Sequence, residues 1–226
     1  MREFNLLGTY PNPRKPRLVG KNIRTIKHRI VASKRDKNFF DGKRDYGYGG
    51  YKYDGRWAKI AKNIIKRYSL KNSSEVLQLA SEKGFLLHEF KMINPRIKVQ
   101  GLETSDYAIS KTLKTVRKDI SKVEDFINFK TKKNKYDFVL ALGVVYTLTL
   151  GDAIKCIKKI QKLSNGKSFI TLATYESERD YWLFKNWTVL GTTMLRKNDW
   201  REVLNHCKYT GDYFFTDARK LSLKKK

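Results

Sequence analysis

Apolar positions follow two alternating patterns from residue 57 onward. Continuous apolar runs at 75–80, 98–103, 136–142 and 168–173 are typical of strands buried on both faces. Between these runs, apolar residues at i, i+3, i+4 and i+7 predict helices, the clearest through Trp57, Ile60, Ala61, Ile64, Ile65 and Tyr68 and through Leu150, Ala153, Ile154, Ile157, Ile160 and Leu163. Strands that alternate with amphipathic helices indicate an α/β fold with a mostly parallel central sheet, covered by helices on both faces.

Weaker signals complete this pattern. A helix is predicted at 84–93, a weak strand at 120–126, a helix around Trp200 and Leu204, and a last strand near 212–215. Thr104 or Ser105 can cap the helix after the second strand, because a hydroxyl there accepts from free amides of the first turn. No internal repeat or second domain is visible, so one domain is expected.

The two ends of the chain are basic and lack apolar periodicity. Prolines at 11, 13 and 16 favour an extended N-terminal arm over 1–38 that is partly ordered by docking on a domain at 39–218. A basic tail at 219–226 ends in three lysines. Between arm and first helix, glycines and tyrosines alternate at 39–51, which suits a loop that closes over a ligand and equally a loop packed on the surface.

The formal charge of +27 comes from 49 lysines and arginines against 22 aspartates and glutamates. Such a field attracts nucleic acid, anionic lipid or acidic partners. The cations are densest at 14–37 and at Lys130, Lys132, Lys133 and Lys135. Lysines spread along the chain also fit a lysine-rich genome, and no nucleic-acid motif accompanies them. Nucleic acid is therefore one candidate partner.

Other features limit the functional classes. No apolar run approaches the ~20 residues of a membrane span, and the N-terminus lacks the apolar core of a secretory signal. The two cysteines, Cys156 and Cys207, fit neither a disulfide framework nor a zinc site, and the three histidines fall in no catalytic spacing. A cytoplasmic protein without a metal is expected.

In open parallel sheets, ligands bind beyond the carboxyl ends of the strands. The first strand-to-helix turn, expected to hold the ligand loop, contains Gln78, Ala80, Ser81, Glu82 and Gly84. About twenty residues further on, the second strand ends in Glu103, the position from which a carboxylate accepts the hydroxyls of a ribose. A helix cap or a surface residue is the alternative interpretation of Glu103.

Several motifs together resemble one group of bacterial class I S-adenosylmethionine-dependent methyltransferases, with small-molecule or sugar acceptors. The segment 40–57, FDGKRDYGYGGYKYDGRW, resembles the region before the cofactor domain of that group. Residues 76–85 are similar in register to its V-L-D-x-G-C-G-K-G-F loop, and 101–103 to its G-I-D. The segments 123–125, 136–139 and 209–213 resemble a G-D or G-N element, an F-D-L-V strand start and a Y-T-G-D-Y closing segment.

The resemblance implies a Rossmann-like methyltransferase fold that binds S-adenosylmethionine. By matched position, Glu103, next to Leu102, would hold the ribose, and Asp125 would accept from the adenine amino group. The backbone of 80–84 would pass under the methionine portion, with Leu142 and Gly143 on the sulfonium side. The lid residues would be Tyr46, Tyr48, Tyr51 and Arg56, since aromatic faces suit a sulfonium cation.

The first loop departs from the family pattern. Gln78 replaces its acidic residue, Ala80 its first glycine and Glu82 its middle glycine. Alanine is a tolerable replacement, but glutamate adds bulk and costs backbone energy if the position needs a positive φ. Gln78 lacks the charge that helps to hold the methionine amino group, and Glu82 is one alternative source of it.

A histidine of the family is also replaced, by Tyr146. A tyrosine with its ordinary pKa of about 10 is a poor base. Tyr146 is either a residue that positions the acceptor or a packed side chain.

Two classes of function remain open. The first is methyl transfer to an oxygen or nitrogen of a small molecule such as a sugar derivative. The second is a catalytically inactive descendant that acts as a structural or RNA-binding subunit, favoured by the altered loop and the charge. An active RNA methyltransferase is a third alternative.

Overall fold

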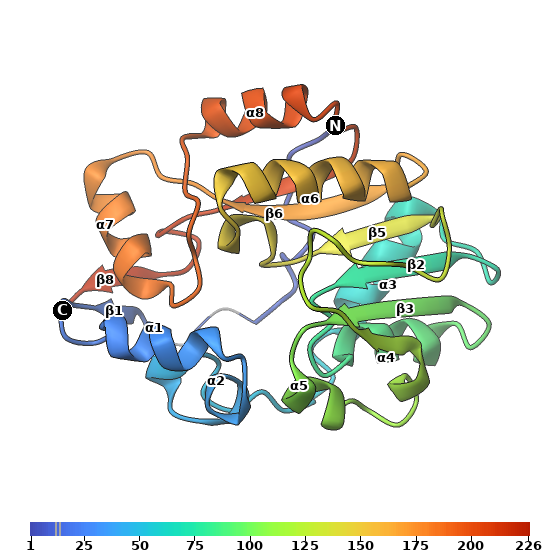
Figure 1. Cartoon of the computed structure of the whole chain (residues 1–226), viewed down its shortest axis with the longest axis horizontal. Helices are drawn as coiled ribbons and strands as arrows, with labels where there is room; N and C mark the ends of the chain where they lie inside the picture. Colours follow the sequence, from blue (N-terminus) through green and yellow to red (C-terminus); the bar gives the residue numbers. More distant parts are fainter. Residues whose placement is uncertain (12, 14) are drawn as a thin grey trace.

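The computed structural model describes residues 1–11, 13 and 15–226, so Arg14 of the basic stretch 14–37 lies outside the described residues. Six strands form the central sheet in the order β4-β3-β2-β5-β6-β7 (Figure 1), and each neighbouring pair is parallel. Their bounds are β2 (Glu75–Leu79), β3 (Lys98–Glu103), β4 (Ile120–Lys122), β5 (Phe138–Ala141), β6 (Ser168–Ala173) and β7 (Asp212–Thr216). The strand order reverses between β2 and β5, which defines the topological switch point.

Helices cover both faces of this sheet, as the apolar pattern predicts. Helices α3 (Ala58–Tyr68) and α4 (Phe85–Ile93) pack on one face, and α6 (Leu150–Leu163) and α8 (Lys197–His206) on the other (Figure 1). Because successive side chains of a strand point to opposite faces, Val76 packs with α3 and α4 while Leu77 packs with α6. The predicted α/β fold with a parallel sheet is confirmed.

Several short elements connect these layers. They are α5 (Asp106–Ser110), the 3₁₀ turns η1 (Arg44–Tyr46), η2 (Arg117–Asp119) and η3 (Val145–Thr147), and helix α7 (Glu178–Trp187). Ser105 caps α5, with its hydroxyl 3.1 Å from the amide of Ala108. Helix α7 was not predicted, because it buries only Leu183 and Phe184 and shows no long apolar stripe.

The first 38 residues, predicted as an extended arm that is partly ordered by docking, contain regular elements from residue 17 onward. They hold β1 (Arg17–Val19), α1 (Ile26–Ser33) and the start of α2 (Lys37–Asp41). Within α1 only Ala32 is buried, so apolar periodicity could not indicate the helix. Its first turn is fixed instead by polar contacts, since the amide of Thr25 donates to Nδ1 of His28 at 3.1 Å.

The basic ends of the chain meet in a second small sheet. Strand β1 pairs in parallel with β8 (Leu223–Lys225), placing Arg17 opposite Leu223. Helix α7 packs on this pair through Leu183, against Val19 and Leu223. The elements β1, α1, α7 and β8 lie side by side in Figure 1, although they are far apart in the sequence.

The cysteines are buried, and the histidines contact neighbouring polar side chains. Cys156 and Cys207 are buried free thiols. His88 contacts the hydroxyl of Thr115 at 2.7 Å, and His206 contacts the ammonium of Lys158 at 3.2 Å. No helix in the described ranges combines the length and apolarity that a membrane crossing requires.

Candidate functional site

Two adjoining cavities lie at the carboxyl ends of β2 and β5, where the strand order reverses. Their volumes are about 200 and 310 Å³. Residues that line both cavities come from the glycine and tyrosine segment, the first loop and the turn after β5: Tyr48, Glu82, Leu142, Gly143 and Tyr146. This is the position at which open parallel sheets bind ligands.

The first loop keeps a glycine-like backbone although two of its residues are not glycine. The φ angles of Ala80, Glu82 and Gly84 are +52°, +54° and +74°. For Ala80 and Glu82 this left-handed conformation costs roughly 1–2 kcal/mol each. The loop is held against β3 by a hydrogen bond from the amide of Ser81 to the carbonyl of Leu102 at 3.0 Å. A Cβ on Gly101 would lie 2.5 Å from the Ser81 hydroxyl, so the close approach requires glycine there.

Glu103, the predicted ribose acceptor, is fully buried at the end of β3. Its Oε1 accepts from the amides of Thr104 and Ser105 at 2.9 and 3.0 Å and from Nη2 of Arg35 at 3.2 Å. Its Oε2 accepts from the amide of Glu82 at 2.8 Å. Three of these donors fill Oε1 and one is on Oε2, so a ribose hydroxyl could bind Oε1 of this buried carboxylate only after Arg35 moves away.

Two lid residues, Tyr48 and Tyr51, form an aromatic stack over the first loop. Their rings are stacked with centroids 4.6 Å apart, and Tyr51 stacks on Phe85 at 4.7 Å. The Tyr48 hydroxyl donates to Oε1 of Glu82. Burial raises the pKa of Glu82, although hydrogen bonds from the two tyrosines oppose the shift. Burial also raises the pKa of both tyrosines, which therefore stay neutral.

The other two predicted lid residues line neither cavity. The ring of Tyr46 packs on His28 with centroids 5.4 Å apart. Arg56 pairs with Asp54, and its Nη1 donates to the Tyr10 hydroxyl at 3.1 Å. The structure thus brings Tyr48 and Tyr51 to the cavities and places Tyr46 and Arg56 outside them.

A buried ion pair that the sequence analysis missed ties the lid segment to the first loop. The ammonium of Lys83 donates to both carboxylate oxygens of Asp41, at 2.8 and 2.6 Å, and to the carbonyl of Tyr51 at 2.7 Å. Tyr107 donates to Asp41 at 2.7 Å. Burial acts to raise the pKa of Asp41, but the bonds from Lys83 and Tyr107 hold it below its usual range. Both residues lie within the family-like segments, so their position in those motifs was an available signal.

Tyr146 lies between the cavities as a neutral phenol. Burial, with a further contribution from the charge of Glu82, raises its pKa to about 12. Its carbonyl accepts from the amides of Thr192 and Thr193 at 2.9 and 3.0 Å, and its ring packs edge-on against Phe184. Such a phenol can orient a ligand by hydrogen bonding but cannot accept a proton near neutral pH.

Asp125 and Leu102 are placed away from the two cavities. Oδ1 of Asp125 accepts from the amides of Asn128 and Ile127, the latter at 2.6 Å, and these bonds lower the pKa of the carboxyl. The carboxylate thereby closes the turn after β4. The side chain of Leu102 is buried in the core that packs against α6.

Two buried polar atoms near the first loop test whether S-adenosylmethionine fits here. Oε1 of Gln78 and Oγ of Ser81 have no hydrogen-bond partner among the described residues. An unsatisfied buried polar atom is costly and marks a place for water or ligand. The first loop and these two polar atoms fit S-adenosylmethionine. Leu142 and Gly143 line both adjoining cavities. Glu103 can also contact S-adenosylmethionine when its ion pair with Arg35 is broken.

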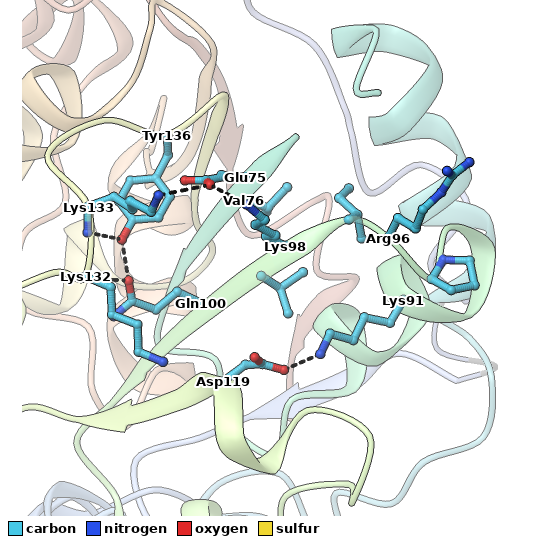
Figure 2. Close-up of a pocket in the computed structure, with 13 residues that line it drawn as sticks. Glu75, Val76, Lys91, Arg96, Lys98, Gln100, Asp119, Lys132, Lys133 and Tyr136 are labelled. Atoms are coloured by element: carbon cyan, nitrogen blue, oxygen red, sulfur yellow. Dashed lines mark hydrogen bonds and ion pairs between the residues drawn. The ribbon is translucent and has the colours of Figure 1, made fainter. Parts of the chain in front are cut away.

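A third cavity, of about 350 Å³, lies at the amino ends of β2 and β3, remote from the switch point (Figure 2). Its cations are Lys91, Arg96, Lys98, Lys132 and Lys133. Three of them form ion pairs: Lys98 and Lys133 with Glu75, and Lys91 with Asp119. We assign it no chemistry because ligands of such sheets bind at the opposite ends of the strands.

The comparisons with known proteins identify the fold. No protein-family model and no curated protein matches the chain. A candidate methyltransferase from Haloferax volcanii, solved in complex with the Trm112 methyltransferase activator, matches 80% of this chain and 75% of its own at 17% identity and a TM-score of 0.52.

Two further solved structures extend the comparison. A candidate methyltransferase from Bacillus halodurans matches 65% of this chain and 67% of its own at 14% identity, also with a TM-score of 0.52. PKMT2 from Rickettsia typhi, solved with AdoHcy, matches 47% of this chain at 20% identity and a TM-score of 0.39, and this chain spans 22% of its length. With its parallel sheet and the strand order that reverses between β2 and β5, the chain has the Rossmann-like fold of the Haloferax volcanii and Bacillus halodurans methyltransferase structures.

Proposed function

We propose that this protein is an S-adenosylmethionine-dependent methyltransferase that acts on an oxygen or nitrogen atom of a small molecule. The observation that carries the proposal is the backbone of the first loop. Ala80 and Glu82 keep positive φ angles beside the switch-point cavities although neither is glycine. Such strain persists only where the surroundings fix it, and it concentrates at ligand sites.

The residues around the cavities have complementary roles in this proposal. The bound donor supplies an electrophilic methyl group on a sulfonium. The aromatic faces of Tyr48 and Tyr51 suit a cation, and the neutral hydroxyl of Tyr146 orients the acceptor. Glu82 is the carboxylate that lines both cavities, and its raised pKa suits a group that accepts the proton released by the acceptor.

Calorimetric titration with S-adenosylmethionine and its demethylated product tests the donor site. We expect Arg35→Gln to bind more tightly than the unmodified chain, by roughly tenfold, because Glu103 is then free to accept ribose hydroxyls. Glu103→Gln should weaken binding by on the order of 2–3 kcal/mol, since it removes charge-assisted hydrogen bonds. Arg96→Gln, which removes an exposed charge at the opposite end of the sheet, is the matched control.

One observation favours a second candidate function, a non-catalytic structural or RNA-binding subunit. The buried carboxylate of Glu103 already accepts from four protein N–H groups, one of them from Arg35, with which it forms an ion pair. The Haloferax volcanii neighbour was solved with an activator protein, so a protein partner is included in this alternative. If folded Arg35→Gln and the unmodified chain both fail to bind the donor at millimolar concentration, the methyltransferase proposal is abandoned in favour of this one.

A further inference from the structure

We propose that the smaller switch-point cavity binds an oxyanion, a phosphoryl or carboxylate group of the acceptor, on Arg24 and Arg44. The inference rests on the proposed function only in assigning the anion to the acceptor; the anion site itself stands on the contacts of the two arginines. Both side chains line the cavity of about 200 Å³ together with Tyr146 and Gly143. An anion held there lies beside the position proposed for methyl transfer.

Arg24 is a buried cation without an anionic partner. Only 6% of the residue is exposed. Its two terminal nitrogens donate to the carbonyls of Trp187 and Arg44, the latter at 2.8 Å, and its Nε is buried without a partner. Among the described residues no carboxylate forms an ion pair with it. A buried charge without a counter-ion is costly, which indicates that a ligand completes the site.

Other cations gather at the same place. The guanidinium groups of Arg17, Arg24 and Arg44 lie 5.4, 3.8 and 5.5 Å from the ring centroid of Trp187. Burial, followed by repulsion from Arg44, lowers the pKa of Arg24 to about 10. Asp45 opposes this effect through space but forms no ion pair within the described part of the chain. The cluster therefore carries positive charge that the protein does not neutralise.

Arg44 is held in place by carbonyl groups. Its Nη1 donates to the carbonyls of Gly47 and Tyr48 at 2.9 and 2.7 Å, which orient the guanidinium but supply no negative charge. A guanidinium presents planar paired donors that match the oxygens of phosphate or carboxylate. The small volume favours one such group on a small molecule, so the acceptor class we infer is a phosphorylated or carboxylated metabolite.

Titration with simple anions tests the site without any donor. The probes are inorganic phosphate, pyrophosphate and malonate at constant ionic strength, with binding followed by calorimetry and by amide NMR shifts around Gly143 and Trp187. We expect Arg24→Gln and Arg44→Gln to weaken the best probe at least tenfold, while Arg96→Gln, which removes the same charge at the opposite end of the sheet, leaves it unchanged. Preference for a phosphate or for malonate distinguishes the two sources of the oxyanion.

Arg44→Gln keeps the test valid if Arg24→Gln fails to fold, since Arg44 is exposed and bonds only to nearby carbonyls. The proposal is overturned if no probe binds the folded chain, or if Arg96→Gln weakens binding as much as Arg44→Gln does. The proposal is also overturned if the probes bind only through the overall charge of the protein, so that a long RNA displaces them no more than an equal rise in ionic strength does. Donor binding without anion binding defeats this inference alone, whereas anion binding without donor binding defeats only the methyltransferase assignment.

Discussion

At the scale of single residues, the motifs predicted the backbone of the first loop but not all of the side-chain contacts around it. The register of 76–85 predicted that Ala80 and Glu82 replace glycines, and both adopt the positive φ that glycine favours. The contact of Glu103 with Arg35 was beyond reach, because the two residues are 68 positions apart and Arg35 lies outside the family-like motifs. Asp41 and Lys83, 42 positions apart, both lie within those motifs, but the motifs do not state that the two side chains pair. Sequence patterns locate the loop, and the fold decides which side chains meet it.

The Lys83 ion pair is expected to dominate the stability of the lid segment. Lys83→Met leaves the carboxylate of Asp41 without its cation, so the free energy of unfolding should fall by about 3 kcal/mol. Urea denaturation followed by circular dichroism gives this value.

The double substitution Lys83→Met with Asp41→Asn is the control for that prediction. Removal of both charges eliminates the unpaired carboxylate, and stability should recover by at least 1 kcal/mol relative to Lys83→Met alone. Additive losses in the double variant would show that the ion pair is not the cause.

Glu82 should impose a pH dependence on stability. Its pKa in the folded chain lies above its ordinary value of 4.5, chiefly because of burial. Between these two pKa values the folded state holds a proton that the unfolded state has lost, so the free energy of unfolding falls as pH rises. Glu82→Gln should flatten the curve above pH 4.5, as measured by urea denaturation at a series of pH values. An unchanged slope would remove Glu82 as its source.

At the scale of elements, the sheet and the helices that cover it were predictable because their apolar periods are long. The runs at β2, β3, β5 and β6 and the stripes of α3 and α6 match the predicted ranges closely. Helix α1 and the β1–β8 pair were missed for one physical reason: polar caps and backbone pairing between distant segments define them, and neither produces periodic hydrophobicity.

The β1–β8 pair should therefore depend on the tail. Removal of residues 221–226 deletes the partner of β1, including the carbonyl of Ser222 that accepts from the amide of Arg17 at 2.9 Å. We expect hydrogen exchange of amides 17–19 to accelerate at least tenfold while β2 and β5 stay protected. The substitutions Lys224→Gln and Lys225→Gln, which keep the backbone, are the control. Equal protection after truncation would contradict the role of the pairing.

At the scale of the whole molecule, charge is the feature that the fold does not explain. The formal net charge of +27 is spread over the chain. Two lysines of the densest run, Lys132 and Lys133, line the cavity at the amino ends of β2 and β3 (Figure 2). In that cavity Glu75 and Asp119 already form ion pairs with three lysines: Lys91, Lys98 and Lys133. The positive charge around this cavity is therefore partly neutralised. Attraction of polyanions should arise from the total charge and not from one surface.

Single-stranded RNA of random sequence measures this attraction. Affinity should fall steeply with salt, because each neutralised phosphate releases counterions, with a logarithmic slope of about −0.7 per contact. The pair Lys132→Gln and Lys133→Gln should weaken binding no more than the pair Lys59→Gln and Lys62→Gln on α3, since all four are exposed lysines. A selective loss in the first pair would instead locate an RNA site at the amino ends of β2 and β3. Affinity that does not change between low and high salt would remove charge as the basis of binding, and the lysines would then reflect composition alone.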